Sequence, residues 1–196
     1  MPSVYQLKPA FQSMLRPLVR RLAAIGVTAN QITVLTCVLS VALGLHLAFG
    51  SRQWVLLPVW LFVRMALNAM DGMLAREHGQ ATRLGALLNE LTDVIADAAL
   101  LLPFAYLPNW SALWVGACIV LAGLTEMTSL AGQTLTGIRR NDGPMGKSDR
   151  ALVEGAVGAW LALGRQPHEV IAPVMALLLV VTVYNRARQI LGAQTK

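Results

Sequence analysis

Long apolar runs restrict what this chain can fold into more than any other feature of its sequence. They lie near 30–50, 54–75, 84–107, 111–136, 150–164 and 169–190. About twenty apolar residues are enough for a helix to cross a bilayer. Hydrophobic residues make up 56% of the chain and charged residues 13%, whereas soluble domains average about 25% charged residues. The sequence predicts an all-α integral membrane protein with about six transmembrane helices, or five if the fifth run, which glycines interrupt, does not span.

The segment ahead of these runs predicts a helix that lies in the membrane interface. Its apolar residues recur at helical spacing opposite basic residues, as in amphipathic interfacial helices. They are Val4, Leu7, Phe11, Leu15, Leu18 and Leu22. Pro17 should kink this helix and favours two short pieces over one rod. We expect a single domain over 1–196, with an interfacial segment at 1–25 and a transmembrane bundle at 30–190.

The positions of the basic residues predict the orientation. Most of the 16 lysines and arginines fall in the N-terminal segment, the second-to-third connection, the fourth-to-fifth connection and the tail. Because positive residues concentrate in cytoplasmic loops, both termini are expected on the cytoplasmic side of a bacterial inner membrane. The basic residues are spread over several short loops without interleaved aromatic residues, which argues against a nucleic-acid partner. Cys37 and Cys118 lie within predicted spans without CxxC spacing, so we expect free thiols.

Residues 68–97, NAMDGMLAREHGQATRLGALLNELTDVIAD, place carboxylates on two of the predicted spans. Ionised side chains are costly in hydrocarbon and are usually functional there. Asn68 and Asp71 share one helix face, while Asn89, Asp93 and Asp97 form a ladder at spacing four on the next helix. A short linker makes the two helices antiparallel, so their polar faces can meet. Facing carboxylate and amide oxygens suit a hard cation such as Mg²⁺.

Small residues accompany these polar side chains. Gly72, Ala75 and Gly85 remove bulk where the two helices face each other. This permits close helix packing or the approach of a ligand to the backbone. A site of this kind near the membrane surface suits a reaction between a water-soluble partner and a lipid-soluble one.

The same stretch resembles the signature of the CDP-alcohol phosphatidyltransferase family, Asp-x2-Asp-Gly-x2-Ala-Arg-x8-Gly-x3-Asp-x3-Asp. The spacing agrees at every position, but Asn68 and Asn89 stand at the first and third aspartate positions. The stretch GVTANQITVLTCVLS is similar to the start of the family's first span, with Ala29 where proline is common. Six helices and an interfacial helix are similar to the family as well.

The resemblance implies a phosphotransferase of phospholipid biosynthesis. A CDP-linked alcohol, usually CDP-diacylglycerol in bacteria, would bind through its diphosphate to Mg²⁺ or Mn²⁺. The hydroxyl of a second alcohol would attack the lipid-side phosphorus, and CMP would leave. By position in the signature, the metal ligands would be Asn68, Asp71, Asn89 and Asp93, with Asp93 also the general base. The residues implied for the nucleotide pocket are Asp71, Gly72, Ala75, Arg76 and Gly85.

Two asparagines at acidic positions leave the metal count open. An amide oxygen can ligate a metal but brings no charge, so Asp71 and Asp93 alone would undercompensate two metals. Asp97 can supply a third negative charge or replace Asp93 as the base, or it can form a structural ion pair with Arg64. Either the site holds one metal, or Asp97 has moved it inward by one turn.

The segment NDGPMGKSDRAL predicts a possible acceptor site. Lys147 and Arg150 flank an expected helix start, and helix N-termini attract anions. In family members with phosphorylated acceptors, basic residues of this region bind the phosphate. A merely solvated loop is an equal alternative. The acceptor alcohol itself cannot be read from the sequence.

Two further questions concern assembly and activity. A homodimer is implied by the resemblance and favoured by small residues at Gly155 and Gly158. A catalytically silent relative that binds CDP-lipid or nucleotide is the first alternative function, because of Asn68 and Asn89. A small transporter is a more distant alternative, since intramembrane acids also mark transport paths. The apolar stretch LLPFAYLPNW argues against it.

Overall fold

The computed structural model describes residues 7–193, and this part of the chain is all-helical. The elements are α1 (Leu7–Ala24), α2 (Ala29–Phe49), α3 (Leu56–Glu77), α4 (Arg83–Leu101), a short 3-10 helix η2 (Leu102–Tyr106), α5 (Ala112–Thr136), α6 (Lys147–Ala162) and α7 (Ile171–Gly192). The predicted all-α class is therefore confirmed. By length and composition, α2, α5 and α7 can each cross a membrane. Six spans remain a prediction, because α3 and α4 carry charged residues and α6 has only 16 residues.

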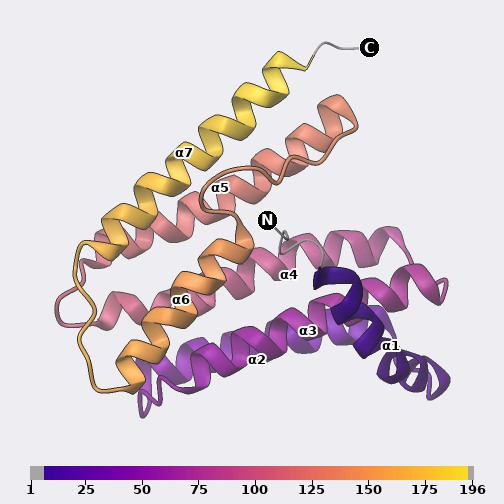
Figure 1. Ribbon diagram of the computed structural model, residues 1–196, viewed down its shortest axis with the longest axis horizontal. Coiled ribbons are helices and arrows are strands. Elements are labelled where there is room, and N and C mark those ends of the chain that lie inside the picture. Colours follow the sequence, from indigo (N-terminus) through magenta and orange to yellow (C-terminus); the bar gives the residue numbers. More distant parts are fainter. Residues whose placement is uncertain (1–6, 194–196) are drawn as a thin grey trace.

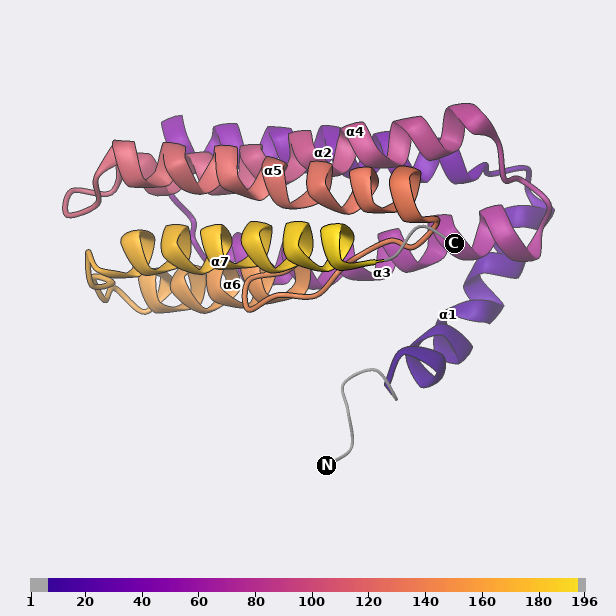
Figure 2. The ribbon, with the colours of Figure 1, turned by 90° about the horizontal axis from the view of Figure 1, so that it is seen from above.

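The bundle has two layers, which Figure 2 shows from above. One layer contains α2, α4 and α5, and the other contains α3, α6 and α7. In Figure 1, α5 and α7 run side by side. The α3–α4 and α5–α6 connections and the last turn of α7 gather toward one end of the bundle, which we call the polar end. This arrangement places the two signature helices α3 and α4 in facing layers.

The start of α2 is fixed by hydrogen bonds to the α3–α4 connection. Thr28 accepts the Gln31 amide at 3.2 Å, and the Gln31 side chain accepts the Thr28 amide at 2.9 Å. This reciprocal pair is a capping box. Gln80, in the connection, accepts the Ala29 amide at 2.7 Å and donates to the Val27 carbonyl at 3.3 Å. The residues that resemble the family's first span are thereby held beside the signature helices.

The first helix differs from the expectation based on Pro17. Instead of two pieces, α1 is one helix that contains Pro17. Ahead of the proline it contacts α3 twice: the Phe11 ring lies edge-on to Phe62 at 6.4 Å, and Arg16 forms a 2.9 Å ion pair with Glu77. These contacts offset the hydrogen bond that proline cannot make. Residues 1–6 of the predicted interfacial segment lie outside the described residues.

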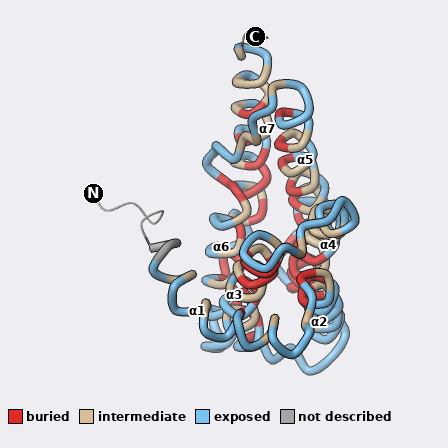
Figure 3. The backbone as a smooth tube through the Cα atoms, turned by 90° about the vertical axis from the view of Figure 1, so that its right-hand side faces the viewer, coloured by how far each residue is buried: buried red, intermediate tan, exposed pale blue. Residues whose placement is uncertain are grey.

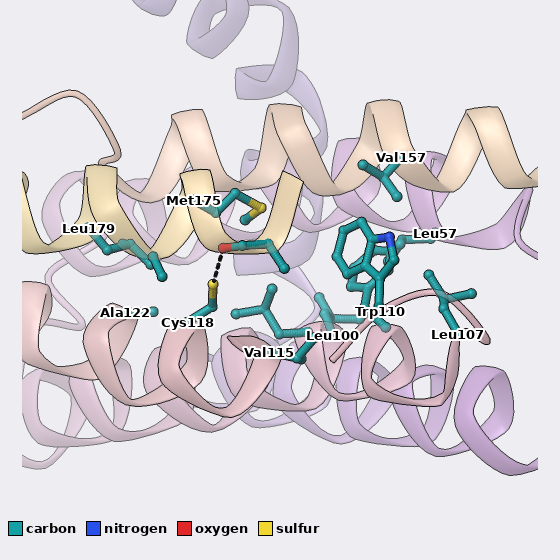
Figure 4. Packing of buried hydrophobic residues seen from close by; sticks show 14 of the residues in the cluster. Leu57, Leu100, Leu107, Trp110, Val115, Cys118, Ala122, Val157, Met175 and Leu179 are labelled. Carbon is teal, nitrogen blue, oxygen red and sulfur yellow. Dashed lines mark hydrogen bonds between the residues drawn. The ribbon is translucent and has the colours of Figure 1, made fainter. Parts of the chain in front are cut away.

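Buried apolar residues lie along the inner sides of the helices (Figure 3), and many long apolar side chains on the outer sides are exposed. The largest cluster includes Trp54, Phe104 and Trp110, whose rings stack at 5.5 and 5.4 Å. Figure 4 shows part of this cluster, including Cys118, which donates to the Ala172 carbonyl. Both Cys118 and Cys37 are free thiols, as expected. Exposed apolar side chains at this density suit contact with lipid.

The glycines on α6 face another helix of the same chain. A Cβ at Gly158 would lie 3.1 Å from Leu57, and one at Gly155 would lie 3.6 Å from Leu61. Both partners belong to α3. These small residues therefore serve packing within the chain. The homodimer stays a prediction that rests on the family resemblance.

The closest helix approach involves Gly44 on α2. A Cβ built there would overlap the backbone carbonyl of Ala99 on α4. We predict that Gly44→Ala lowers the free energy of unfolding by about 1–3 kcal/mol, as overpacking usually does. Gly116→Ala, on α5 with open space around it, is the control and should be neutral or stabilising because alanine favours helix. Denaturant titration in detergent micelles measures both, and equal stability of the two variants would contradict the predicted close contact.

Candidate functional site

The two signature helices present their polar residues to each other. The Asn68 amide on α3 lies 3.4 Å from Asp93 Oδ1 on α4, in position to donate. Asp71 follows Asn68 by three residues and Asn89 precedes Asp93 by four, so each pair shares a helix face. The contact across the helices, together with this spacing, brings Asn68, Asp71, Asn89 and Asp93 to one region. The predicted meeting of the polar faces is therefore present.

Asp71 is buried, and α2 supplies its hydrogen-bond partner. The Thr33 hydroxyl donates to Asp71 Oδ2 at 2.9 Å. Thr33 matched the family pattern at the start of the first span, but the sequence did not connect it with the acidic site. Its location one turn after the Thr28 cap is what directs its hydroxyl toward α3. Thr33 is thus a site residue that only the packing of α2 on α3 reveals.

Asp93 is approached by three donors at the same oxygen. Lys147 Nζ lies 2.5 Å from Oδ1, an Arg64 guanidinium nitrogen 3.3 Å and the Asn68 amide nitrogen 3.4 Å. Within residues 7–193, no hydrogen bond or ion pair is made to Oδ2. One oxygen of Asp93 is thus held by the protein, and the other is open to a ligand.

Asp97 occupies a different environment, one turn farther along α4. It is 7% exposed, and its two oxygens each lie 2.6 Å from an arginine, Oδ1 from Arg64 and Oδ2 from Arg150. The structural ion pair with Arg64, one of the three alternatives for Asp97, is therefore present. A second arginine, which was not anticipated, completes it. Buried charges require this kind of pairing.

These contacts belong to one continuous chain of alternating charge. Arg150 also contacts Glu126 at 3.3 Å, and Arg139 contacts both Glu126 and Glu90. This series of ion pairs joins α3, α4, α5, α6 and the α5–α6 connection. In order, its members are Glu90, Arg139, Glu126, Arg150, Asp97, Arg64, Asp93 and Lys147. Four acids and four bases cancel, so this ion-pair chain carries no formal net charge.

The small residues of the signature make room for side chains. A Cβ at Gly72 would lie 2.9 Å from the Arg76 guanidinium, which folds back over it. A Cβ at Gly85 would lie 2.6 Å from the Asn30 side chain, and the Gly85 amide donates to Thr82 at 2.9 Å. Ala75 is half-buried and packs against a second, smaller hydrophobic cluster that includes Val19 of α1 and Met73 of α3. Arg76, among the predicted nucleotide residues, is exposed.

The predicted acceptor residues are already engaged by acids. Lys147 contacts Asp93, whereas Arg150 is 1% exposed and contacts Asp97 and Glu126. The sequence placed Lys147 and Arg150 at a helix start, and α6 does begin at Lys147. Their ion pairs with α4 and α5 could not be read from the sequence.

The donor set fits a divalent cation. Among residues 7–193, no group of three or more His, Cys, Asp or Glu side chains lies together. The signature region instead offers two carboxylates, Asp71 and Asp93, beside the amides Asn68 and Asn89. Carboxylate and amide oxygens are the ligands that Mg²⁺ and Mn²⁺ prefer. The absence of a counter-ion for Asp71 within the described range leaves room for one such ion beside Asn68, Asn89 and Asp93.

A cavity of about 600 Å³ adjoins this region between α3 and α6. Its polar wall includes Arg64, Asn68, Asp97, Lys147, Arg150 and Glu154. Apolar side chains such as Leu61, Phe62 and Leu152 form the remaining wall. The cavity therefore connects a charged site with an apolar surface, as a reaction on a lipid would need.

Known proteins resemble the whole chain. A model of the CDP-alcohol phosphatidyltransferase family matches residues 26–185. Inner membrane protein YnbA of Escherichia coli (strain K12) is 46% identical over 194 residues, which is 96% of each chain. A phosphatidylinositol phosphate synthase of Mycobacteroides abscessus is 30% identical over 191 residues, which is 91% of this chain and 84% of that protein.

Solved structures share the fold. The phosphatidylinositol phosphate synthase of Mycobacterium tuberculosis with CDP-DAG bound has a TM-score of 0.71 and 21% identity, over 90% of this chain and 92% of that one. The same enzyme in complex with manganese and citrate has a TM-score of 0.74 and 20% identity, over 90% and 88%. Identity this low supports a common fold and no more.

The bridging contact of Asp97 gives a stability prediction. Asp97→Asn removes the shared negative charge from two buried arginines, so the free energy of unfolding should fall by about 3–5 kcal/mol. Glu77→Gln, which breaks the exposed pair with Arg16, is the control and should change little. Denaturant titration in micelles measures both variants. If Asp97→Asn were as stable as Glu77→Gln, the ion-pair chain would not be a main source of stability.

Proposed function

The chain belongs to the CDP-alcohol phosphatidyltransferase family, and from this membership we propose how its own residues perform the transfer. The protein is a membrane enzyme of phospholipid biosynthesis that transfers a substituted phosphate group from a CDP-alcohol to a second alcohol. We propose CDP-diacylglycerol as the donor, which is consistent with the CDP-DAG bound to the Mycobacterium tuberculosis enzyme of the same fold. The single observation that carries the proposal is the contact of Asn68 and Asp93 across the signature helices.

In the proposed reaction, Asp93 is the general base. The acceptor oxygen forms a bond to the lipid-side phosphorus, the bond between the two phosphates breaks, and CMP leaves. The hydroxyl proton passes to Oδ2 of Asp93, because Lys147 and Arg64 occupy Oδ1. A base near its substrate oxygen can assist the attack in this way. Asp97 has a positioning role in this proposal, since it holds Arg64 against Asp93.

We propose that the signature residues hold one divalent cation, Mg²⁺ or Mn²⁺. Such an ion, when bound, neutralises charge on the diphosphate. Asn68, Asp71, Asn89 and Asp93 would be its protein ligands. The ion-pair chain that contains Asp93 is formally neutral, so Asp71 is the one signature carboxylate without a counter-ion. A second divalent cation would be poorly compensated there.

The remaining signature residues are proposed to bind the nucleotide. They are Asp71, Gly72, Ala75 and Arg76 on the C-terminal half of α3 and Gly85 in the first turn of α4. Arg76 is exposed and covers Gly72, so its guanidinium can move to a phosphate without breaking a buried contact. Arginine is well suited to bind phosphate oxygens in pairs.

One observation favours a catalytically silent relative as the alternative. Lys147 lies 2.5 Å from the proposed base, so an acceptor hydroxyl would have to share this carboxylate with a protein cation. Such a relative would still bind CDP-lipid or nucleotide. We also propose cytoplasmic termini and a homodimer; the first is supported by the basic residues at the polar end and the second by the family resemblance.

The function is tested by CMP release from CDP-diacylglycerol in mixed micelles with a panel of alcohols. We predict release by the wild-type protein and a decrease of at least about 100-fold in Asp93→Asn, because general bases contribute about this much. CDP binding should weaken only modestly, since Asp71, Gly72 and Arg76 remain. Asp142→Asn, in the exposed α5–α6 connection, is the control. Full activity of Asp93→Asn would exclude it as the base, and CDP binding without release by any acceptor would favour the silent relative.

The metal proposal makes a separate prediction. EDTA should abolish CMP release, and titration of Mn²⁺ followed by electron paramagnetic resonance should give one bound ion per chain. Affinity for Mn²⁺ should rise at least about tenfold when CDP is present, because its phosphates add negative charge. The double variant Asn68→Asp/Asn89→Asp should bind Mn²⁺ more tightly without CDP. Two ions in the wild-type protein, or activity that survives chelation, would contradict the proposal.

A further inference from the structure

We propose that the acceptor is an alcohol without a phosphate group, held in the cavity between α3 and α6 with Glu154 as a binding residue. This inference rests on the proposed transferase function and names the class of its second substrate. It differs from the phosphorylated acceptor that Lys147 and Arg150 would suggest by position. The contacts of these two bases, of the α6 N-terminus and of Glu154 carry the argument.

Each group that would bind an acceptor phosphate is already neutralised by a carboxylate. Lys147 contacts Asp93 at 2.5 Å, and Arg150 contacts Asp97 at 2.6 Å. At the N-terminus of α6 the Asp149 carboxylate accepts the Gly146 amide at 2.9 Å, so a negative side chain already lies beside the first turn. A phosphate would have to displace these acids and then lie beside them. Like charges at this distance in a buried site repel strongly.

Glu154 is a buried acid with no partner of its own. It is 4% exposed, lies one turn after Arg150 on α6, and lines the cavity. Within residues 7–193, its carboxylate makes no hydrogen bond and no ion pair. A buried polar group without a partner is costly, so a ligand that donates a hydrogen bond to Glu154 would be favoured. A phosphate dianion cannot do this, whereas a hydroxyl or an ammonium group can.

Two buried arginines form part of the same cavity wall. The Nε atoms of Arg64 and Arg150 are buried without a hydrogen-bond partner among the described residues, and both arginines line the cavity. A hydroxyl group both donates and accepts. An alcohol with more than one hydroxyl can therefore donate to Glu154 with one hydroxyl while another faces the arginines of the cavity wall. Arg64 and Lys147 line the cavity and also contact Asp93, so a ligand there lies next to the proposed base.

The experiment compares each alcohol with its own phosphate ester, using purified full-length protein, CDP-diacylglycerol micelles and Mn²⁺. The pairs are glycerol with glycerol 3-phosphate, inositol with inositol 1-phosphate, and ethanolamine with phosphoethanolamine. CMP release and ligand-induced thermal stabilisation in the presence of CDP are both measured. For at least one pair, we expect kcat/KM and binding to be at least about tenfold greater for the unphosphorylated alcohol, given the cost of like charges. Ethanolamine shows whether Glu154 prefers an ammonium group.

The variant Glu154→Gln removes the charge and keeps the side-chain size. It should raise KM for the preferred alcohol at least about tenfold, with CDP binding unchanged, because a hydrogen bond to a charged group is stronger than one to a neutral amide. Glu169→Gln, at an exposed acid in the α6–α7 connection, is the matched control. An unchanged KM in Glu154→Gln would remove Glu154 from the acceptor site.

The outcomes separate this inference from the function on which it rests. If only phosphate esters support CMP release, the transferase function stands and the inference is overturned. If no compound supports CMP release, the proposed transferase function fails. The binding measurements then test the inference by themselves, and tighter binding of an ester than of its parent alcohol overturns it. Absence of binding by every parent alcohol, while CDP binds, also counts against it.

Discussion

Asp97 lies between two buried arginines, and the packing at the polar end depends on this contact. Arg64 comes from α3 and Arg150 from α6, so one carboxylate on α4 joins three helices at 2.6 Å on each side. A buried charge without a partner costs several kcal/mol. In the ion-pair chain from Glu90 to Lys147, acids and bases alternate. Each charge except the two at the ends therefore lies between two opposite charges, which offsets the cost of burial. The same ion pairs that make burial tolerable also fix the angle at which α3, α4 and α6 meet.

The proposed base belongs to this chain, so stability and chemistry share residues. Asp93 receives Lys147 and Arg64 at one oxygen, which orients the carboxylate and lowers the local negative charge. In the family signature, aspartates stand where this chain has Asn68 and Asn89. Restored acids there would add negative charge beside Asp71, and Lys147 would have competing partners. Asn68 and Asn89 bring no negative charge, and Lys147 adds one positive charge. Both features suit the proposed site with a single metal ion.

Much of the fold could be predicted from local sequence, whereas the ion-pair chain could not. Apolar runs gave the positions of α2, α3, α5 and α7 to within a few residues, because helix length and hydropathy are local properties. Spacing placed Asn68 and Asp93 on facing surfaces for the same reason. Contacts of Asp97 with Arg150, and of Asp93 with Lys147, depend on where α6 lies, which no local pattern determines. The glutamate within the apolar run of α5, Glu126, was a signal that a buried cation would be found. The prediction of two short helices around Pro17 was wrong, because α1 continues through the proline. Contacts of α1 with α3 offset the one missing hydrogen bond.

The C-terminal helix influences the site without reaching it. Arg186 on α7 donates to the carbonyls of Asn141 at 3.3 Å and Asp142 at 3.0 Å, and Thr182 accepts the Met145 amide at 3.0 Å. Gly143 has φ +135°, and a Cβ there would lie 2.5 Å from Thr182, so only glycine allows this close approach. These contacts fix the α5–α6 connection, which carries Arg139 and leads directly into Lys147. Lys147 and Arg139 are the two cations nearest the ends of the ion-pair chain, so the contacts of α7 with this connection support both ends of that chain.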